Sequence, residues 1–239
     1  MVRFVTALLA ACLLPCIAMA EDAPVPTLNS GDTAWMLTSS LLVLMMSLPG
    51  LALFYGGLVR KDNILATLMQ TFAVACVVSI VWPLAGYTMA FTEGSPWLGG
   101  FDRLLLTGMK ADTLSGTIPE SVFVMFQMTF AIITCALLMG AVADRIKFSA
   151  IILLSILWIL FVYSPIAHWV WGPGGALGGT GMKDYAGLFG FGTALDFAGG
   201  TVVHISSGIA GLVAAMVLGK RLETPSTSSN VILSMMGAC

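Results

Sequence analysis

The chain has 239 residues, of which 58% are hydrophobic and 9% are charged, and its formal net charge is −2 at pH 7. A soluble domain carries about 25% charged residues, so this composition and a mean hydropathy of +0.98 argue against a soluble protein. They indicate a polytopic protein of the lipid bilayer. The net charge gives no indication of nucleic-acid binding, and no basic patch suggests it.

Residues 1–20 have the pattern of a secretory signal peptide. Arg3 lies near the start, an apolar stretch covers 4–18, and a small-x-small site follows at 18–20. A basic start, a short apolar core and such a cleavage site are typical of a signal peptide. We therefore expect the mature chain to begin with Glu21. The alternative interpretation is a short first spanning helix.

The cysteines give no sign of a disulfide framework or a metal site. Cys12 and Cys16 belong to the expected signal peptide. Cys76 and Cys135 lie in apolar runs, and Cys239 is the last residue. No spacing among them matches a known ligand or disulfide pattern. We expect no cofactor and no metal.

The rest of the chain divides into apolar runs separated by short polar breaks. Each full run is long enough for a helix that crosses a hydrocarbon core of roughly 30 Å. We expect residues 21–33 to lie outside the membrane and 34–239 to form the membrane domain, an all-α polytopic fold. The expected spans are 34–59, 65–91, 121–143, 148–171 and 201–218, with the start of a sixth at 230–239.

Basic residues gather in three short, alternate loops. These are Arg60 with Lys61, Arg145 with Lys147, and Lys220 with Arg221. Because Lys and Arg accumulate in cytoplasmic loops, these three loops are predicted to face the cytoplasm. The mature N-terminus is then outside, which agrees with a cleaved signal peptide. The expected location is the inner (plasma) membrane.

The two long outside loops differ in composition. Residues 93–120 form a mixed polar connection, which we interpret as a plain loop. Residues 171–200 are dense in glycine. Such a segment either flexes or lets the backbone approach something closely, and it leads directly into the fifth span.

The stretch from Asp196 to His204 places a carboxylate and an imidazole beside an apolar run. An ionisable group within the membrane costs at least roughly 2 to 3 kcal/mol, so His204 is expected to face a substrate or proton pathway. The alternative is a neutral ring hydrogen-bonded between helices. Gly200 and Gly208 lie four residues to either side of His204, so the space around the ring is expected to be open.

Asp196 precedes this helix by a few residues. There a carboxylate can accept hydrogen bonds from the first backbone N–H groups and meet the positive end of the helix dipole. We prefer this capping interpretation to a role as direct proton acceptor.

Three aromatic residues are candidates for a cation site. Phe126 and Phe130 are four residues apart and therefore project from one face of a helix. Trp171 lies at the outer end of the fourth span. Each taken alone is ordinary for a lipid-facing, core or interfacial position. Together they could hold a small cation by cation–π attraction of about 0.5 to 2 kcal/mol.

Two further features are interpreted as structural. Ser207, Gly211, Ala215 and Gly219 are spaced by four, which favours close helix packing. His168 lies near the end of the fourth span.

Four segments together resemble the ammonium transporter (Amt/Mep/Rh) family. In chain order they are Pro49-Gly-Leu-Ala-Leu-Phe-Tyr-Gly-Gly-Leu-Val-Arg60, Ala143-Asp-Arg-Ile-Lys-Phe-Ser149, Pro165-Ile-Ala-His-Trp-Val-Trp-Gly172, and Asp196-Phe-Ala-Gly-Gly-Thr-Val-Val-His204 followed by Ile-Ser-Ser-Gly-Ile-Ala-Gly. The resemblance covers nearly everything from about Asp32 onward, in the family's order.

The resemblance implies a role for each candidate residue. Phe126 and Phe130 match the aromatic gate, and Trp171 matches the tryptophan of the outer binding site. Asp196 matches the carboxylate linked to ammonium recognition and deprotonation. His204 matches the first of the twin pore histidines, so His168 is not the pore residue.

The resemblance also implies the architecture and the activity. Family members have about eleven spans in two inverted halves and form trimers. The sequence ends where the sixth span would begin, so we expect the N-terminal half of a transporter, which alone would not transport ammonium. The implied activity is passage of ammonium as ammonia, without enzymatic chemistry. The implied partners are two further copies and a cytoplasmic PII-type regulator.

Two alternatives remain from the sequence. One is an ammonium sensor built on the same fold. The other is a different channel for a small neutral solute, such as water or urea. The absence of asparagine-proline repeats argues against a water channel.

Overall fold

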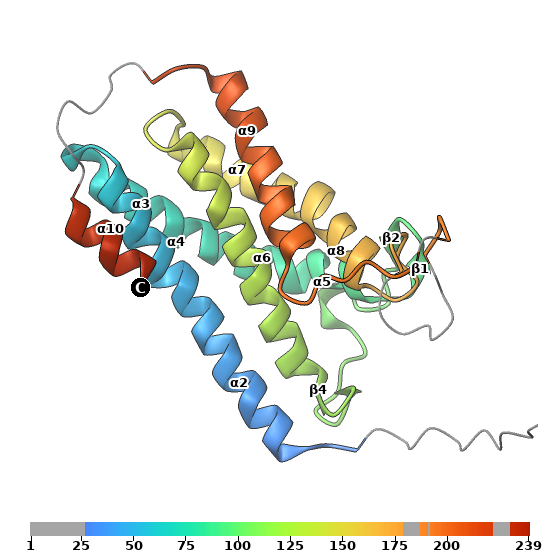
Figure 1. Ribbon diagram of the computed structural model, residues 1–239. Helices are drawn as coiled ribbons and strands as arrows, with labels where there is room; N and C mark the ends of the chain where they lie inside the picture. Colours follow the sequence, from blue (N-terminus) through green and yellow to red (C-terminus); the bar gives the residue numbers. More distant parts are fainter. Residues whose placement is uncertain (1–26, 179–186, 191, 222–229) are drawn as a thin grey trace, which may run out of the picture.

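A computed structural model describes residues 27–178, 187–190, 192–221 and 230–239. The expected signal peptide, residues 1–20, and the first part of the segment 21–33 lie outside the described residues. Figure 1 shows a bundle of long helices, with irregular loops and short hairpins gathered near one end.

The helical elements include several short 3₁₀ and π-helical turns, labelled η. In chain order they are α2 (Ser30–Met45), η1 (Met46–Leu51), α3 (Ala52–Leu58), η2 (Lys61–Asn63), α4 (Ile64–Val81), η3 (Trp82–Gly86), α5 (Tyr87–Phe91), η4 (Leu104–Leu106), α6 (Glu120–Val142), α7 (Phe148–Trp158), η5 (Ile159–Tyr163), α8 (Ser164–Trp171), η6 (Gly200–Ile205), α9 (Ser206–Leu218) and α10 (Val231–Ala238).

Five continuous helical stretches are long and apolar enough to cross a membrane. They are Ser30–Leu58, Lys61–Phe91, Glu120–Val142, Phe148–Trp171 and Gly200–Leu218. The all-α polytopic fold class predicted from the sequence is therefore confirmed.

The first helix starts four residues before the expected boundary at 34. The Oδ1 atom of Asn29 accepts hydrogen bonds from the backbone N–H groups of Gly31 (2.8 Å) and Asp32 (3.0 Å). An asparagine in this position satisfies donors that the first helical turn leaves without partners. The cap, rather than the start of the apolar run, sets the boundary.

Four of the five stretches contain a π-helical turn, and only α6 runs without interruption. Proline explains three of these interruptions in part: Pro49 lies within η1, Pro83 within η3, and Pro165 at the start of α8, directly after η5. Proline cannot donate a backbone hydrogen bond and forces the chain to adjust locally. The straight α6 thus serves as the axis of the bundle, and α2 and α9 lie along it (Figure 1).

The core packs around α6 and the bent helices beside it. Trp82, Ile132 and Tyr163 are fully buried there. The Trp82 indole N–H donates to the backbone oxygen of Val124 at 3.1 Å, so this large side chain is buried without an unpaired donor. Between membrane helices such side chains stabilise the fold by close packing and hydrogen bonds rather than by removal from water.

The loop 92–119 contains more structure than expected. Two antiparallel hairpins form in it, β1 (Gly94–Ser95) with β2 (Leu98–Gly99) and β3 (Leu114–Ser115) with β4 (Ile118–Pro119). The prediction of a plain loop was therefore wrong. Two-residue strands give too short a pattern to be recognised from alternating polarity.

At the opposite end of the bundle, polar contacts join three loops. Asn63 Nδ2 donates to Asp144 Oδ1 at 2.6 Å, and Arg221 lies 3.8 Å from Asp144 Oδ2. The neighbouring Arg145 donates through Nη1 to the backbone oxygen of Gly219 at 2.6 Å and through Nη2 to that of Ala141. These contacts fix the end of α9 to the end of α6.

Candidate functional site

Phe126, Phe130 and Trp171 lie together, as their spacing and the family resemblance suggested. The ring centroids of Phe126 and Phe130 are 5.0 Å apart, and those of Phe130 and Trp171 are 5.9 Å apart. Both pairs meet edge to face, the arrangement that aromatic quadrupoles prefer. The two phenylalanines come from adjacent turns of α6, whereas Trp171 is the last residue of α8.

These rings line a cavity of about 240 Å³, which we call the aromatic cavity. Its lining also includes a carboxylate and an amide. The residues are Phe91, Phe123, Phe126, Gln127, Phe130, Trp171, Asp196 and Phe197. The cavity is therefore apolar over most of its wall and has a few polar groups.

Four of these lining residues were not among the predicted site residues: Phe91, Phe123, Gln127 and Phe197. Gln127 is the most informative, because its Oε1 atom is buried and has no hydrogen-bond partner within the described parts of the chain. A buried acceptor without a partner is costly, and this atom lies beneath the cavity surface rather than on it. No sequence pattern distinguishes it from any other helical glutamine.

Asp196 makes the contacts of a helix cap. Its Oδ1 accepts from the backbone N–H of Gly200 at 2.5 Å, and its Oδ2 accepts from Thr201 and Val202, both at 2.9 Å. The indole N–H of Trp171 donates to the Asp196 backbone oxygen at 2.6 Å. These contacts agree with the capping interpretation. They place a carboxylate at the start of η6 and in the wall of the aromatic cavity.

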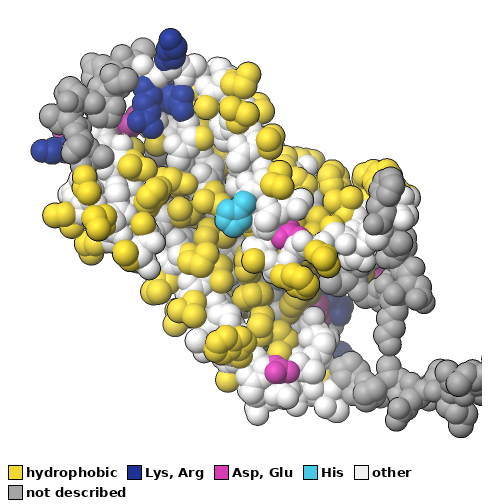
Figure 2. All heavy atoms as spheres, in the orientation of Figure 1, with side chains coloured by type: hydrophobic (Ala, Val, Ile, Leu, Met, Phe, Trp, Pro, Cys, Tyr) yellow, Lys and Arg dark blue, Asp and Glu magenta, His cyan; other side chains and the backbone are white. Residues whose placement is uncertain are grey.

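His204 lies on an open face of the molecule. The side chain is exposed, and its Nδ1 lies 3.1 Å from the backbone oxygen of Gly199 in its own segment. Since a carbonyl oxygen only accepts, Nδ1 carries the hydrogen in this contact, and Nε2 of a neutral ring is then an acceptor. Figure 2 shows a histidine on a largely hydrophobic face.

A groove of about 390 Å³ runs past this histidine. It is lined by Leu137, Ala141, His204, Ser207, Gly208, Gly211, Leu212 and Ala215. A Cβ added to Gly208 would have no atom within 4 Å, which agrees with the expected open space. Gly211 instead lies close to Ala141: a Cβ added to Gly211 would be 3.0 Å from the Ala141 Cβ. This is expected for close packing of α9 on α6.

The aromatic cavity and the histidine groove follow one another along α6 and along the segment that leads from Asp196 into α9. Phe126 and Phe130 precede Leu137 and Ala141 on α6. In the other wall, Asp196 precedes His204 and the small residues of α9. The arrangement thus places aromatic rings, a carboxylate and an imidazole in one order along one side of α6.

His168 occupies a different place. It is fully buried, with Nδ1 at 3.0 Å from the Ala90 backbone oxygen and Nε2 at 2.9 Å from that of Ser95. It therefore joins α8 to the end of α5 and to the β1–β2 hairpin. It lines neither the aromatic cavity nor the histidine groove.

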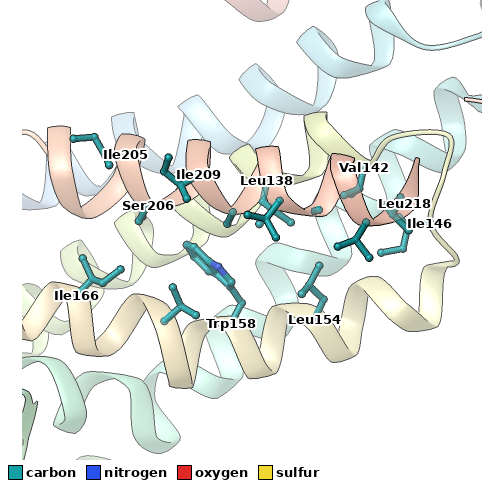
Figure 3. A pocket seen from close by; sticks show the side chains of 15 residues that line it. Leu138, Val142, Ile146, Leu154, Trp158, Ile166, Ile205, Ser206, Ile209 and Leu218 are labelled. Atoms are coloured by element: carbon teal, nitrogen blue, oxygen red, sulfur yellow. The ribbon is translucent and has the colours of Figure 1, made fainter. Parts of the chain in front are cut away.

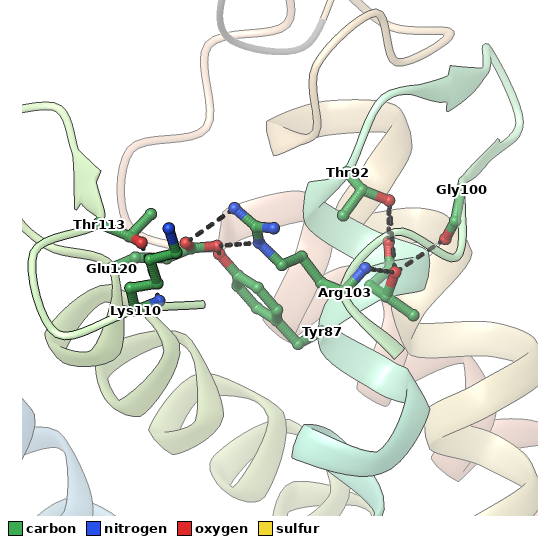
Figure 4. Close-up of polar contacts among 8 residues, drawn as sticks. Tyr87, Thr92, Gly100, Arg103, Lys110, Thr113 and Glu120 are labelled. Carbon is green, nitrogen blue, oxygen red and sulfur yellow. Dashed lines mark hydrogen bonds and ion pairs between the residues drawn. The ribbon is translucent and has the colours of Figure 1, made fainter. Parts of the chain in front are cut away.

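A polar cluster beside the aromatic cavity was not predicted. Arg103 donates to Glu120 through Nε (2.9 Å) and Nη2 (3.2 Å), and the Tyr87 hydroxyl donates to Glu120 at 3.0 Å (Figure 4). The hydrogen bond to Glu120 is the main reason why the pKa of Arg103 is raised above its usual range. These residues line a second cavity of about 280 Å³.

A further cavity, of about 670 Å³, has no comparable chemistry. It lies between α7, η5 and α8 on one side and α9 on the other, against α6 (Figure 3). Side chains such as Leu154, Trp158 and Ile209 line it, and Ser206 is the one polar residue in its wall. It offers no set of converging polar groups and is not a candidate for binding a small cation.

Comparison with known proteins gives the family. Residues 34–239 match the sequence model of the Ammonium Transporter Family. The ammonium transporter of Bacillus subtilis (strain 168) is 50% identical over 213 residues, which cover 88% of this chain and 49% of that protein. Ammonium transporter Amt1 of Archaeoglobus fulgidus is 40% identical over 215 residues, covering 88% of this chain and 50% of Amt1.

Solved structures agree with the sequence matches. The crystal structure of Candida albicans Mep2 superposes with a TM-score of 0.75 at 33% identity, covering 88% of this chain and 46% of Mep2. A sensor Amt protein superposes with a TM-score of 0.73 at 25% identity, covering 86% of this chain and 50% of that protein. The chain spans about half the length of the curated relatives that it matches. It belongs to the ammonium transporter family.

Proposed function

We propose that the chain forms part of a transporter that takes up ammonium and conducts it as ammonia. The observation that carries this proposal is the order of groups along α6: an aromatic cavity with a carboxylate in its wall, followed by a groove that contains His204. A cation is captured first, and a neutral molecule then passes the imidazole.

Capture at the aromatic cavity follows from its wall. Phe130 and Trp171 present ring surfaces, and a cation near such a ring gains about 0.5 to 2 kcal/mol. The Asp196 carboxylate adds a negative field to the same cavity. Potassium has no N–H groups and would have to exchange its hydration water for very few oxygens. The wall therefore favours ammonium over potassium.

Loss of a proton follows from the cost of charge in an apolar groove. The wall around His204 consists of aliphatic and small residues, apart from Ser207. An ammonium ion buried there without compensation is far less stable than ammonia. The ion therefore gives its proton to water on the outer side of the aromatic cavity, and only ammonia enters the groove. The Nδ1–H group of His204 donates its hydrogen bond to the Gly199 backbone oxygen. The Nε2 atom of the neutral ring therefore carries no hydrogen and can accept a hydrogen bond from passing ammonia.

The open face around His204 supports a second half of the pore. Lipid cannot form hydrogen bonds with an exposed imidazole, and an unsatisfied polar group in hydrocarbon costs several kcal/mol. We propose that a second, inverted half covers this face and completes the lumen. From family resemblance alone we add two proposals, a homotrimer and a cytoplasmic PII-type regulator. The basic loops and the expected signal peptide support a plasma-membrane protein with its mature N-terminus outside.

Transport is preferred to sensing as the function. A solved sensor Amt protein has the same fold, but at 25% identity, whereas the named transporter of Bacillus subtilis is 50% identical. None of the site geometry distinguishes a sensor from a transporter. The greater similarity to the transporter favours transport.

Reconstitution tests the proposal. The 239-residue chain alone is compared with a chimera in which the second half of the Bacillus subtilis transporter follows Cys239. Both are placed in liposomes, and internal pH is followed after an ammonium pulse. We expect saturable flux from the chimera and flux from the chain alone no greater than from empty liposomes. A folded, trimeric chimera without ammonium-dependent flux would contradict the proposal.

A further inference from the structure

We infer that Glu120 is a positioning residue for the aromatic cavity. Through Tyr87 and Arg103 it holds Phe91 and Phe123, which line that cavity together with Trp171 and Asp196. The inference rests on the proposed function and deepens it, because it assigns the affinity of the cation site partly to residues that do not contact the cation.

Glu120 is buried and fully engaged. It is the first residue of α6 and only 6% exposed. Its carboxylate accepts two hydrogen bonds from Arg103 and one from Tyr87, and its backbone N–H donates to the Thr113 oxygen at 2.8 Å. A buried carboxylate needs such partners. Since its partners already neutralise it, Glu120 serves to hold other groups rather than to bind a cation.

Tyr87 carries this restraint to the aromatic wall. Its ring stacks on Phe91, with centroids 5.8 Å apart and planes at 29°. Phe91 in turn meets Phe123 edge to face, with ring centroids 5.1 Å apart. The Phe123 ring also meets the Tyr87 ring edge to face, with centroids 6.4 Å apart. The three rings form one cluster, and the hydrogen bond to Glu120 fixes the polar end of the tyrosine. A shift of Tyr87 would displace both phenylalanines.

Arg103 fixes the same cluster from the loop. Its backbone N–H donates to Thr88 Oγ1 at 3.1 Å, and that hydroxyl donates to the Gly100 oxygen at 3.0 Å. The guanidinium reaches across to Glu120 (Figure 4). One residue therefore joins α5, the loop after it and the start of α6. This holds Phe91 on α5 at a constant position relative to Phe123 on α6.

Phe91 and Phe123 separate two different environments. Both line the aromatic cavity, and both also line the polar cavity that contains Arg103. If these rings moved apart, water and the field of a guanidinium would reach the cation site. Water weakens electrostatic attraction and a like charge opposes a cation. The expected consequence is weaker capture of ammonium, with little change in conduction past His204.

Steady-state flux through the chimera tests this inference, with Tyr87→Phe as the mildest variant. It removes one hydroxyl and keeps the ring. We expect the KM for ammonium to rise about threefold to tenfold, the size of effect that follows from loss of one buried hydrogen bond. The maximal rate should stay within about twofold of the wild type, because the change affects binding and not conduction. Glu120→Gln should raise KM in the same way. The combined variant should raise KM by less than the product of the two changes, because both alter one contact.

Glu93→Gln is the matched control, because Glu93 is an exposed acid in the loop that carries Arg103. It should leave KM unchanged. Flux through the wild-type chimera reports separately on the proposed function, so the ratio of KM values reports on positioning alone. Wild-type KM in both Tyr87→Phe and Glu120→Gln would overturn the inference. A fall in maximal rate at constant KM would also overturn it, since it would indicate a general structural role.

Discussion

The two histidines of this chain lie in similar apolar sequence surroundings but in contrasting structural ones. His168 is fully buried, and its ring nitrogens face backbone oxygens of Ala90 and Ser95, which belong to other elements. His204 is exposed, and the contact of its Nδ1 among the described residues is with the backbone oxygen of Gly199, in its own segment. Both histidines lie in apolar runs, so the sequence does not separate them. A ring whose nitrogens face backbone oxygens of other elements has a structural role, whereas a ring bonded within its own segment keeps a nitrogen available to a substrate.

Replacement of each histidine by alanine should separate the two most clearly in the stability of the folded protein. His168→Ala removes a buried ring and the donor of at least one hydrogen bond to a backbone oxygen, so we expect a loss of about 2 to 5 kcal/mol in stability. His204→Ala should change the amount of folded protein little. Size-exclusion chromatography of both variants of the chimera after detergent extraction measures the difference. Equal folded yields for the two variants would remove the structural distinction.

The reverse effect is expected in transport. At matched protein levels, His204→Ala should change ammonium flux or its selectivity over methylammonium by about tenfold, which corresponds to about 1.4 kcal/mol in a barrier. The folded fraction of His168→Ala should keep the selectivity of the wild type. Flux of both ions in liposomes provides the measurement. Wild-type flux and selectivity in His204→Ala would assign this histidine to structure as well.

Asp196 allows a finer test, because it both caps the helix of His204 and lines the aromatic cavity. Asp196→Ala loses the acceptor of three backbone N–H groups and should cost about 1 to 2 kcal/mol in stability and abolish flux. Asp196→Asn keeps an acceptor oxygen but no charge, so it should keep much of the expression and lose most of the flux. Thermal unfolding and flux are measured on the same preparations. Wild-type flux in Asp196→Asn would show that the charge is not needed.

The smallest expected effect concerns topology and should leave function intact. His168 lies at the end of the molecule that we propose to be outside, and the basic loops lie at the other end. A cysteine that replaces Lys110 should react with an impermeant reagent added to whole cells, and one that replaces Lys61 should react only after permeabilisation. Cys76, Cys135 and Cys239 are first replaced by serine. The opposite labelling pattern would invert the proposed orientation.

Short-range patterns in the sequence predicted much of this arrangement. Apolar runs predicted the helices to within four residues, because length and polarity determine them locally. The spacing of Phe126 and Phe130 placed both rings on one face, and the position of Asp196 before an apolar helix predicted a cap. Each of these contacts joins residues that are close in sequence or follow directly from helix geometry.

Contacts between distant segments could not be predicted in this way. Glu120 meets Arg103 and Tyr87 across 17 and 33 residues, respectively, and the meeting depends on the path of the loop between them. Phe91, on α5, enters the cavity wall for the same reason. Nothing in the residue types or their local spacing encodes which of many polar and aromatic residues will meet.

The contacts at the two ends of α9 also limit how this helix can move. At one end the Trp171 indole N–H, on α8, donates to the Asp196 backbone oxygen just before η6, and at the other Arg145, which follows α6, donates to the carbonyl oxygen of Gly219. A slide of one helical turn, about 5.4 Å, would break the hydrogen bonds at both ends at once. We therefore propose that α9 keeps its height against α6, and that the path past His204 opens and closes by rotation of side chains such as Phe126 and Phe130.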